Sequence, residues 1–106
     1  RGMSEQQTLF ATADGYAAVH DIVVGRCSMC HARQPVYDGI RRAPKHIYLE
    51  TEFDITAEAG AVFLQSAASH AMPPANVTWM EEGERAQIRR WFRNATEHMP
   101  LRVALQ

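Results

Sequence analysis

The chain lacks long hydrophobic runs, an excess of charge of either sign, and more than a few cysteines. Its longest apolar stretch, Ala59 to Leu64, has six residues, whereas a helix that crosses a bilayer needs about 20. The net charge is −1, which argues against a nucleic-acid partner, because phosphate binding requires a cationic excess. Two cysteines are too few for the disulfide framework of a small secreted scaffold. We therefore expect no membrane span and no nucleic-acid binding.

The length of 106 residues and the apolar content of 46% are typical of a single folded domain. No export signal is visible near Arg1, so we expect either that a signal has been removed or that the chain is a fragment of a larger protein. Residues 1–12 are predicted to be a flexible linker. A core of this size is marginal, so a bound prosthetic group with its own apolar surface would stabilise the fold.

Apolar residues spaced by three and four predict an all-α domain of three main helices without strands. The helices cover about residues 14–25, 54–68 and 78–95, and the third begins with a capping box of Thr78 and Glu81. The segment 32–53 is too long for a plain connector in a compact domain. We therefore expect this segment to wrap around a bound group.

The most informative motif is Cys27-Ser28-Met29-Cys30-His31, the C-x-x-C-H pattern of covalent haem c attachment. This spacing lets two thiols add to the two vinyl groups while the adjacent imidazole reaches the iron from one face. The alternatives are a thioredoxin-like redox pair and half of a zinc site. A thioredoxin-like pair normally accompanies a βαβ pattern, and a structural zinc site needs four ligands. We therefore predict one covalent haem, with Cys27 and Cys30 as its attachment points and His31 as an iron ligand.

Met72 is the preferred second axial ligand, because the prolines that follow it restrict the local backbone. A His/Met pair raises the reduction potential, as suits an electron carrier. The alternative ligand is His70, which would lower the potential. Methionine is also an ordinary core residue, and the other methionines considered as ligands are Met29, Met80 and Met99.

Several further residues are candidates for the haem environment. Backbone carbonyls around Ala43-Pro44 could accept a hydrogen bond from the second ring nitrogen of a ligating histidine. Cationic or indole donors for the haem propionates are Arg41, Arg42, Lys45 and Trp79. The remaining histidines, His20, His46 and His98, are interpreted as structural or surface residues.

Taken together, the helix before the C-x-x-C-H motif, the Met-Pro loop and the last amphipathic helix resemble a class I cytochrome c fold. More specifically, the chain resembles the carboxy-terminal cytochrome c domain of bacterial membrane-bound urate oxidases, the PuuD family. The strings that carry this resemblance are Cys-Ser-Met-Cys-His-Ala at 27–32, Pro35-Val36, Ala43-Pro44-Lys45, Leu49-Glu50-Thr51, Leu64-Gln65, and Ser69-His70-Ala71-Met72-Pro73-Pro74 with Asn76 and Thr78. Two departures are Trp79, where a small residue is expected, and Lys45-His46, where Lys-Gly is expected.

The resemblance implies that Cys27 and Cys30 hold the haem, that His31 is the proximal ligand and that Met72 is the distal ligand. It also implies a domain on the periplasmic side of the bacterial inner membrane that relays electrons from urate oxidation to a respiratory acceptor. Its partners would be the upstream membrane urate oxidase domain and a downstream cytochrome or terminal oxidase. This domain alone is not expected to oxidise urate. Alternatives are a haem-based sensor or ligand-binding domain, a stand-alone cytochrome c, and a haem-free zinc or dithiol domain.

Overall fold

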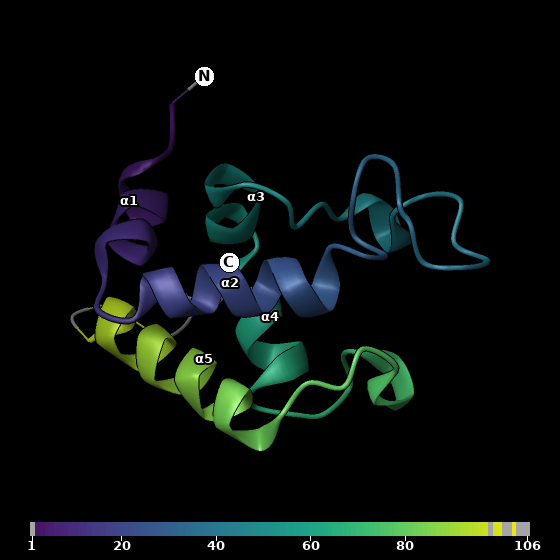
Figure 1. The fold of residues 1–106 in the computed structure, drawn as a ribbon. Coiled ribbons are helices and arrows are strands. Elements are labelled where there is room, and N and C mark those ends of the chain that lie inside the picture. Colours follow the sequence, from purple (N-terminus) through teal and green to yellow (C-terminus); the bar gives the residue numbers. More distant parts are fainter. Residues whose placement is uncertain (1, 98, 101–102, 104–106) are drawn as a thin grey trace.

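The computed structural model describes residues 2–97, 99, 100 and 103. These residues form five α-helices and two short 3-10 helices (Figure 1). In chain order, the elements are α1 (Glu5–Thr12), α2 (Tyr16–Cys27), η1 (Pro44–His46), α3 (Glu52–Ala57), α4 (Ala59–Ser66), η2 (Pro74–Asn76) and α5 (Glu82–Thr96). No strand occurs among the described residues, so the predicted all-α class is confirmed for this part of the chain.

Helix α1 lies within the segment 1–12, for which the sequence predicts a flexible linker; residue 1 lies outside the described residues. A reciprocal capping box of Ser4 and Gln7 starts this helix. Phe10 is only 1% exposed, and its carbonyl accepts a 2.8 Å hydrogen bond from the Trp91 indole. So short a helix is marginal in isolation, so its contacts with α3 and α5 stabilise it in addition to the capping box.

Helix α2 is shifted by two residues from the predicted range 14–25. Its N-cap is Gly15, with a φ of 93°, a backbone conformation that glycine adopts without steric cost. Val19 and Val23 are fully buried on one face of the helix. The helix continues past Gly25 and ends at Cys27, so the first cysteine of the motif lies on its last turn.

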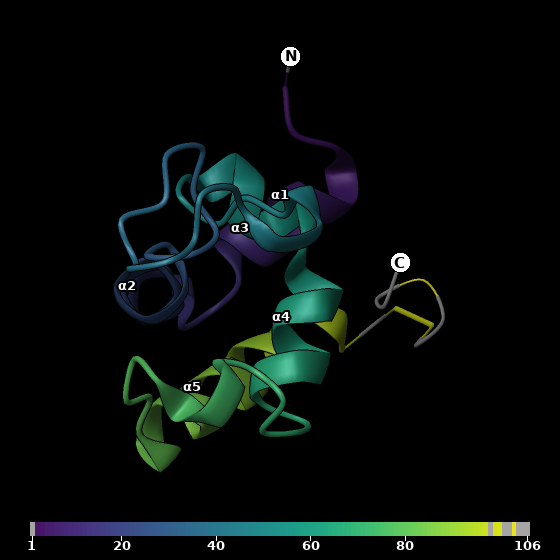
Figure 2. The same ribbon diagram turned by 90° about the vertical axis from the view of Figure 1, so that its right-hand side faces the viewer.

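Two helices, α3 and α4, replace the single helix predicted for about residues 54–68. Thr51 and Asp54 form a capping box at the start of α3. The break lies at Glu58, whose φ of −110° and ψ of 22° are not helical. Its N–H is shared between the carbonyls of Asp54 and Ile55, at 3.3 and 3.2 Å. Because the chain bends here, α4 takes a different direction from α3 (Figure 2).

Helix α5 confirms the third predicted helix, although it begins later than predicted. Its N-cap is Glu81, which forms a capping box with Glu84. Thr78, the predicted capping residue, lies in the preceding loop, where its hydroxyl donates to the Arg26 carbonyl at 2.7 Å. Its apolar stripe comprises Ile88, Trp91 and Phe92, which are buried, and Ala95, which is half-buried.

Helix α5 packs against α1, α2 and α4, and α1 also packs against α3. The two long loops, residues 28–51 and 67–81, lie at the same end of the molecule, on the right in Figure 1. This arrangement brings the segment after the cysteine motif and the segment around Met72 to one region. None of the helices described combines the length and the apolar sequence that a membrane crossing requires.

Candidate functional site

A cavity of about 270 Å³ lies between α2, α4 and the two long loops. Its volume is near the lower end of the roughly 300–1,000 Å³ that is typical of small-molecule sites. Its lining consists mainly of apolar groups and comprises Cys27, His31, Pro44, Lys45, Ile47, Leu49, Glu58, Ala61, Val62, Gln65, Ser66 and Met72. Five residues with predicted roles, Cys27, His31, Pro44, Lys45 and Met72, thus lie around one cavity.

The C-x-x-C-H motif forms a tight turn at the end of α2. The backbone amides of Cys30 and His31 both donate to the Cys27 carbonyl, at 3.2 and 2.9 Å. Cys27 is buried and lines the cavity, whereas Cys30 is half-buried and lies outside the lining. Both thiols are free. The turn therefore joins the His31 backbone to Cys27, and both residues line the cavity.

Burial raises the pKa of both thiols. Desolvation raises the pKa of Cys27 to about 12 and also raises the pKa of Cys30. Dithiol oxidoreductases depend on a cysteine whose pKa is lowered, because the thiolate is the nucleophile. The electrostatic environment of this pair is therefore the opposite of that of a redox-active dithiol.

The ring of His31 is oriented by the backbone of the long loop. Its Nδ1 lies 3.0 Å from the Ile47 carbonyl. Because a carbonyl can only accept, Nδ1 is the donor, so in a neutral ring Nε2 is the nitrogen with a lone pair for a ligand. The His31 carbonyl also accepts a 2.7 Å hydrogen bond from the Leu49 amide. The sequence suggested an acceptor around Ala43-Pro44, whereas the structure assigns this role to Ile47; Pro44 itself lines the cavity.

Met72 and His70 differ clearly in position. Met72 is half-buried, lines the cavity, and donates its amide to the Gln65 carbonyl at 2.8 Å. His70 is exposed and lies outside the lining, with Nε2 2.8 Å from a carboxylate oxygen of Glu82. Of the two predicted alternatives, only Met72 faces the same cavity as His31.

The other methionines lie elsewhere. Met80 is 4% exposed and belongs to the main hydrophobic core, and Met99 packs against that core. Met29 is half-buried in the turn of the C-x-x-C-H motif, where its carbonyl accepts from two loop amides. None of the three lines the cavity.

The residues predicted to donate to the haem propionates differ in whether they line the cavity. Lys45 lines the cavity, but Arg41, Arg42 and Trp79 do not. Arg41 is exposed, and Trp79 is 77% exposed. Neither side chain lines this cavity, and the assignment of Arg41 and Trp79 to the haem environment stays a prediction.

The remaining histidines take no part in the cavity. His20 is half-buried, with its ring 5.9 Å from the Tyr16 ring, and His46 is exposed. His98 lies outside the described residues. Within the described part of the chain, no three His, Cys, Asp or Glu residues form a group that could hold a metal ion.

Two arginines near the cavity were not anticipated from the sequence. Arg26, adjacent to Cys27, forms a bidentate pair with Glu84 at 3.0 and 3.1 Å. Arg85 is 2% exposed and donates to the carbonyl of Met72 at 3.0 Å. The position of Arg85, three residues before Ile88 on the apolar stripe of α5, is the sequence signal that could have identified it as buried.

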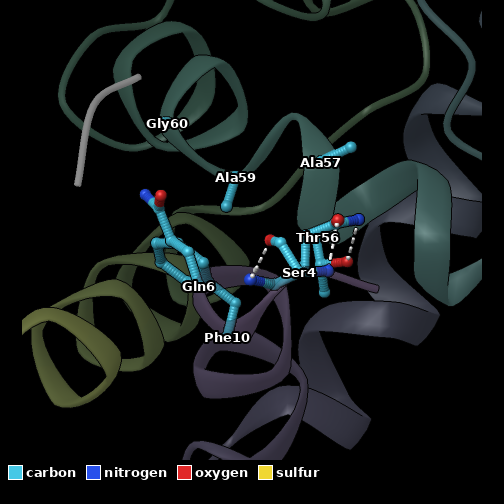
Figure 3. A pocket seen from close by; sticks show the side chains of 8 residues that line it. Ser4, Gln6, Phe10, Thr56, Ala57, Ala59 and Gly60 are labelled. Atoms are coloured by element: carbon cyan, nitrogen blue, oxygen red, sulfur yellow. Dashed lines mark hydrogen bonds between the residues drawn. The ribbon is translucent and has the colours of Figure 1, made fainter. Parts of the chain in front are cut away.

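A second cavity, of about 170 Å³, lies where α1 meets the junction of α3 and α4 (Figure 3). Its lining is partly polar, and includes Gln7, which donates to the Thr56 hydroxyl at 3.3 Å. No residue with a predicted role lines this cavity. The cavity that contains Cys27, His31 and Met72 is therefore the candidate site.

Comparisons of the chain with protein-family models, with curated proteins and with solved structures find no match.

Proposed function

We propose that this chain is an electron-transfer domain of the class I cytochrome c type, with one haem c bound covalently through Cys27 and Cys30. His31 and Met72 would be the axial ligands of its iron. The observation that carries the proposal is that His31 and Met72, which come from separate loops, line one cavity together with Cys27. The haem supplies a one-electron iron couple when bound.

The donor set fits a haem. The hydrogen bond from His31 Nδ1 to the Ile47 carbonyl leaves Nε2 free to coordinate. The thioether of Met72 is a soft ligand that favours iron in a haem over a hard cation. Both thiols are free, as the formation of thioether bonds requires. These groups are the ones that covalent attachment and His/Met ligation require.

The surrounding residues would tune the group and protect it from water. The apolar side chains of Ile47, Leu49 and Val62 line the cavity, and a cavity of low polarity disfavours the more highly charged oxidised iron. The Ile47 carbonyl orients His31 and increases its basicity as a ligand. The chain would therefore bind, orient and shield the group, while electrons pass to partners through a small, transient interface.

The resemblance to the carboxy-terminal domain of membrane-bound urate oxidases extends the proposal to a physiological role. In that role, electrons from urate oxidation in a fused membrane domain reach this domain and continue to a cytochrome or terminal oxidase. The domain would act on the periplasmic side of the inner membrane. No residue of this chain is proposed to touch urate, so its own task is relay.

The proposal is tested by expressing the chain together with the machinery for haem c maturation and recording oxidised and dithionite-reduced absorption spectra. We expect a sharp reduced α-band and haem that stays with the protein after acid-acetone extraction. The double variant Cys27→Ala/Cys30→Ala is the control and should yield extractable haem or none. A colourless wild-type protein, or haem that is extracted, would overturn the proposed function.

A further inference from the structure

We propose that Arg85 is a positioning residue for Met72: its buried guanidinium holds the Met72 loop against α4 and keeps a permanent positive charge beside the cavity. This inference rests on the proposed function, because it assigns a role toward the proposed axial ligand. It concerns a residue that does not itself line the cavity.

The guanidinium of Arg85 joins three parts of the chain. Its Nη1 donates to the Ser66 carbonyl at 2.7 Å and to the Met72 carbonyl at 3.0 Å. Its Nη2 lies 3.3 Å from the side-chain oxygen of Asn76. Ser66 is the last residue of α4, whose terminal carbonyls have no partner within the helix. The guanidinium thus connects the end of α4 to Met72 and to Asn76, which lie before and after the two prolines of the loop.

Asn76 extends this arrangement to the end of the loop. Its side-chain oxygen accepts from the Met80 amide at 3.0 Å, and its side-chain nitrogen donates to the Met80 carbonyl at 3.0 Å. The stretch from Met72 to Met80 is therefore organised around one buried cation. Charge-assisted hydrogen bonds of this kind are roughly twice as strong as neutral ones.

The charge of Arg85 is only partly compensated. The carboxylate that approaches it belongs to Glu82, 3.8 Å from Nε and 66% exposed, whereas the Arg85 side chain is 2% exposed. The charge of Arg85 also acts on Cys27, which lines the cavity. Burial raises the pKa of this thiol, and the positive charge of Arg85 partly offsets the increase. Arginine stays protonated in proteins. A fixed positive charge near the iron favours its reduced form.

Arg89, one turn further along α5, provides a matched control. Its Nη1 donates to the Ala67 carbonyl at 3.0 Å, so it also binds the carboxyl end of α4. Its side chain is 39% exposed, and its hydrogen bond reaches Ala67, the first residue of the loop, instead of Met72. A change at Arg89 removes an arginine from the same end of α4 but leaves the contact with Met72.

The test compares Arg85→Lys and Arg85→Met with Arg89→Lys and Arg89→Met in the haem-loaded protein. The readouts are the methionine-sulfur band of the ferric spectrum, the rate of carbon monoxide binding to the ferrous form, and the midpoint potential. Arg85→Lys should weaken the band and increase the carbon monoxide rate about tenfold, as expected for the loss of one charged hydrogen bond. Arg85→Met should also lower the potential, because the charge is lost. Both Arg89 variants should match the wild type.

Wild-type values of all three readouts in the Arg85 variants would overturn the proposal, even if their melting temperatures fall. If Arg85→Met does not fold, the result for Arg85→Lys decides whether the proposal holds. Lysine retains the positive charge but lacks the planar guanidinium that donates to Ser66, Met72 and Asn76. A wild-type protein without covalent haem would instead overturn the proposed function. Thermolysin digestion of the haem-free protein tests the role of Arg85 independently of haem binding. Cleavage within residues 67–80 should be faster in Arg85→Lys than in Arg89→Lys. Equal cleavage rates would contradict the role of Arg85 in holding the loop.

Discussion

Arg26 and Thr78, 52 positions apart, exchange two hydrogen bonds: Arg26 Nη1 donates to the Thr78 carbonyl at 2.9 Å, and the Thr78 hydroxyl donates to the Arg26 carbonyl at 2.7 Å. Arg26 directly precedes Cys27, and Thr78 lies in the loop that carries Met72. These bonds connect the segment proposed to attach the haem with the segment proposed to supply its distal ligand. They therefore fix the distance between two sides of the candidate site.

The first prediction concerns this connection. Thr78→Val removes the hydroxyl donor with little change in shape and should lower the free energy of unfolding by about 1 kcal/mol. Thr78→Ser, which keeps the hydroxyl, is the control, and its free energy of unfolding should fall by less. Urea unfolding followed by circular dichroism measures both. If Thr78→Val is as stable as the wild type, the hydrogen bond to Arg26 contributes nothing to stability.

The second prediction concerns the distal ligand. Met72→Ala should retain covalent haem through Cys27 and Cys30 but lose the methionine-sulfur band of the ferric spectrum. Met80→Leu changes a methionine that is 4% exposed and lies outside the cavity lining, so it should keep the band. Survival of the band in Met72→Ala, or its loss only in Met80→Leu, would assign the distal position to another residue.

The third prediction concerns acid stability. Two hydrogen bonds from Arg33 to the Asp54 carboxylate, both 2.9 Å, hold the pKa of Asp54 at about 2, below its ordinary value of 3.8. Because the folded-state pKa is the lower one, the stabilisation is present above pH 3.8 and is lost as the pH falls toward 2. The loss should be about 1–2 kcal/mol, since solvent at Arg33 screens part of the interaction.

The measurement for Asp54 is the free energy of unfolding from pH 6 to pH 2 in the wild type and in Asp54→Asn. Other carboxylates, including Glu50 and Glu84, also have a lowered pKa, so both proteins should lose stability in acid. The difference between the two curves should narrow as the pH falls from about 4 to 2. Parallel curves would show that Asp54 does not titrate in this range.

The fourth prediction concerns Trp79, which has a φ of 64°. Its side chain is 77% exposed. Residues other than glycine are disfavoured in this left-handed region of backbone conformation. Because the indole is mostly exposed, removing it loses little buried surface. Trp79→Gly should therefore raise the free energy of unfolding by about 0.5–1 kcal/mol. Trp79→Ala keeps the unfavourable backbone and should change stability by less. A destabilised Trp79→Gly would indicate that the indole makes contacts in solution that offset its backbone conformation.

The fifth prediction separates a haem attachment site from a dithiol site. In the haem-free protein, both thiols should be free, and Cys27, whose pKa is raised to about 12 by burial, should react with iodoacetamide far more slowly at pH 8 than the half-buried Cys30. In the haem-loaded protein, neither should react. Two equally reactive thiols in a colourless protein would favour a dithiol function.

Local patterns predicted a large part of the site because the chemistry of the motif is contiguous. The turn from Cys27 to His31 follows from a helix end, and the last helix follows from its apolar stripe. The predictions that failed depended on distant contacts. Helix α1 is held through Phe10 by Trp91, 81 positions away, and Thr78 bonds to Arg26 instead of capping α5.

The amino-acid sequence alone determined the all-α class, the positions of the motif and of Met72, and the absence of any long apolar run, because these depend on residue type and on spacing within one or two turns. Tertiary structure decided which carbonyl orients His31, which of Met72 and His70 faces the cavity, and where Arg85 donates. Each of these depends on a hydrogen bond or contact between segments that only packing brings together. A polar group that is buried by packing takes whichever partner the neighbouring backbone offers, and that partner is not encoded in its own local sequence.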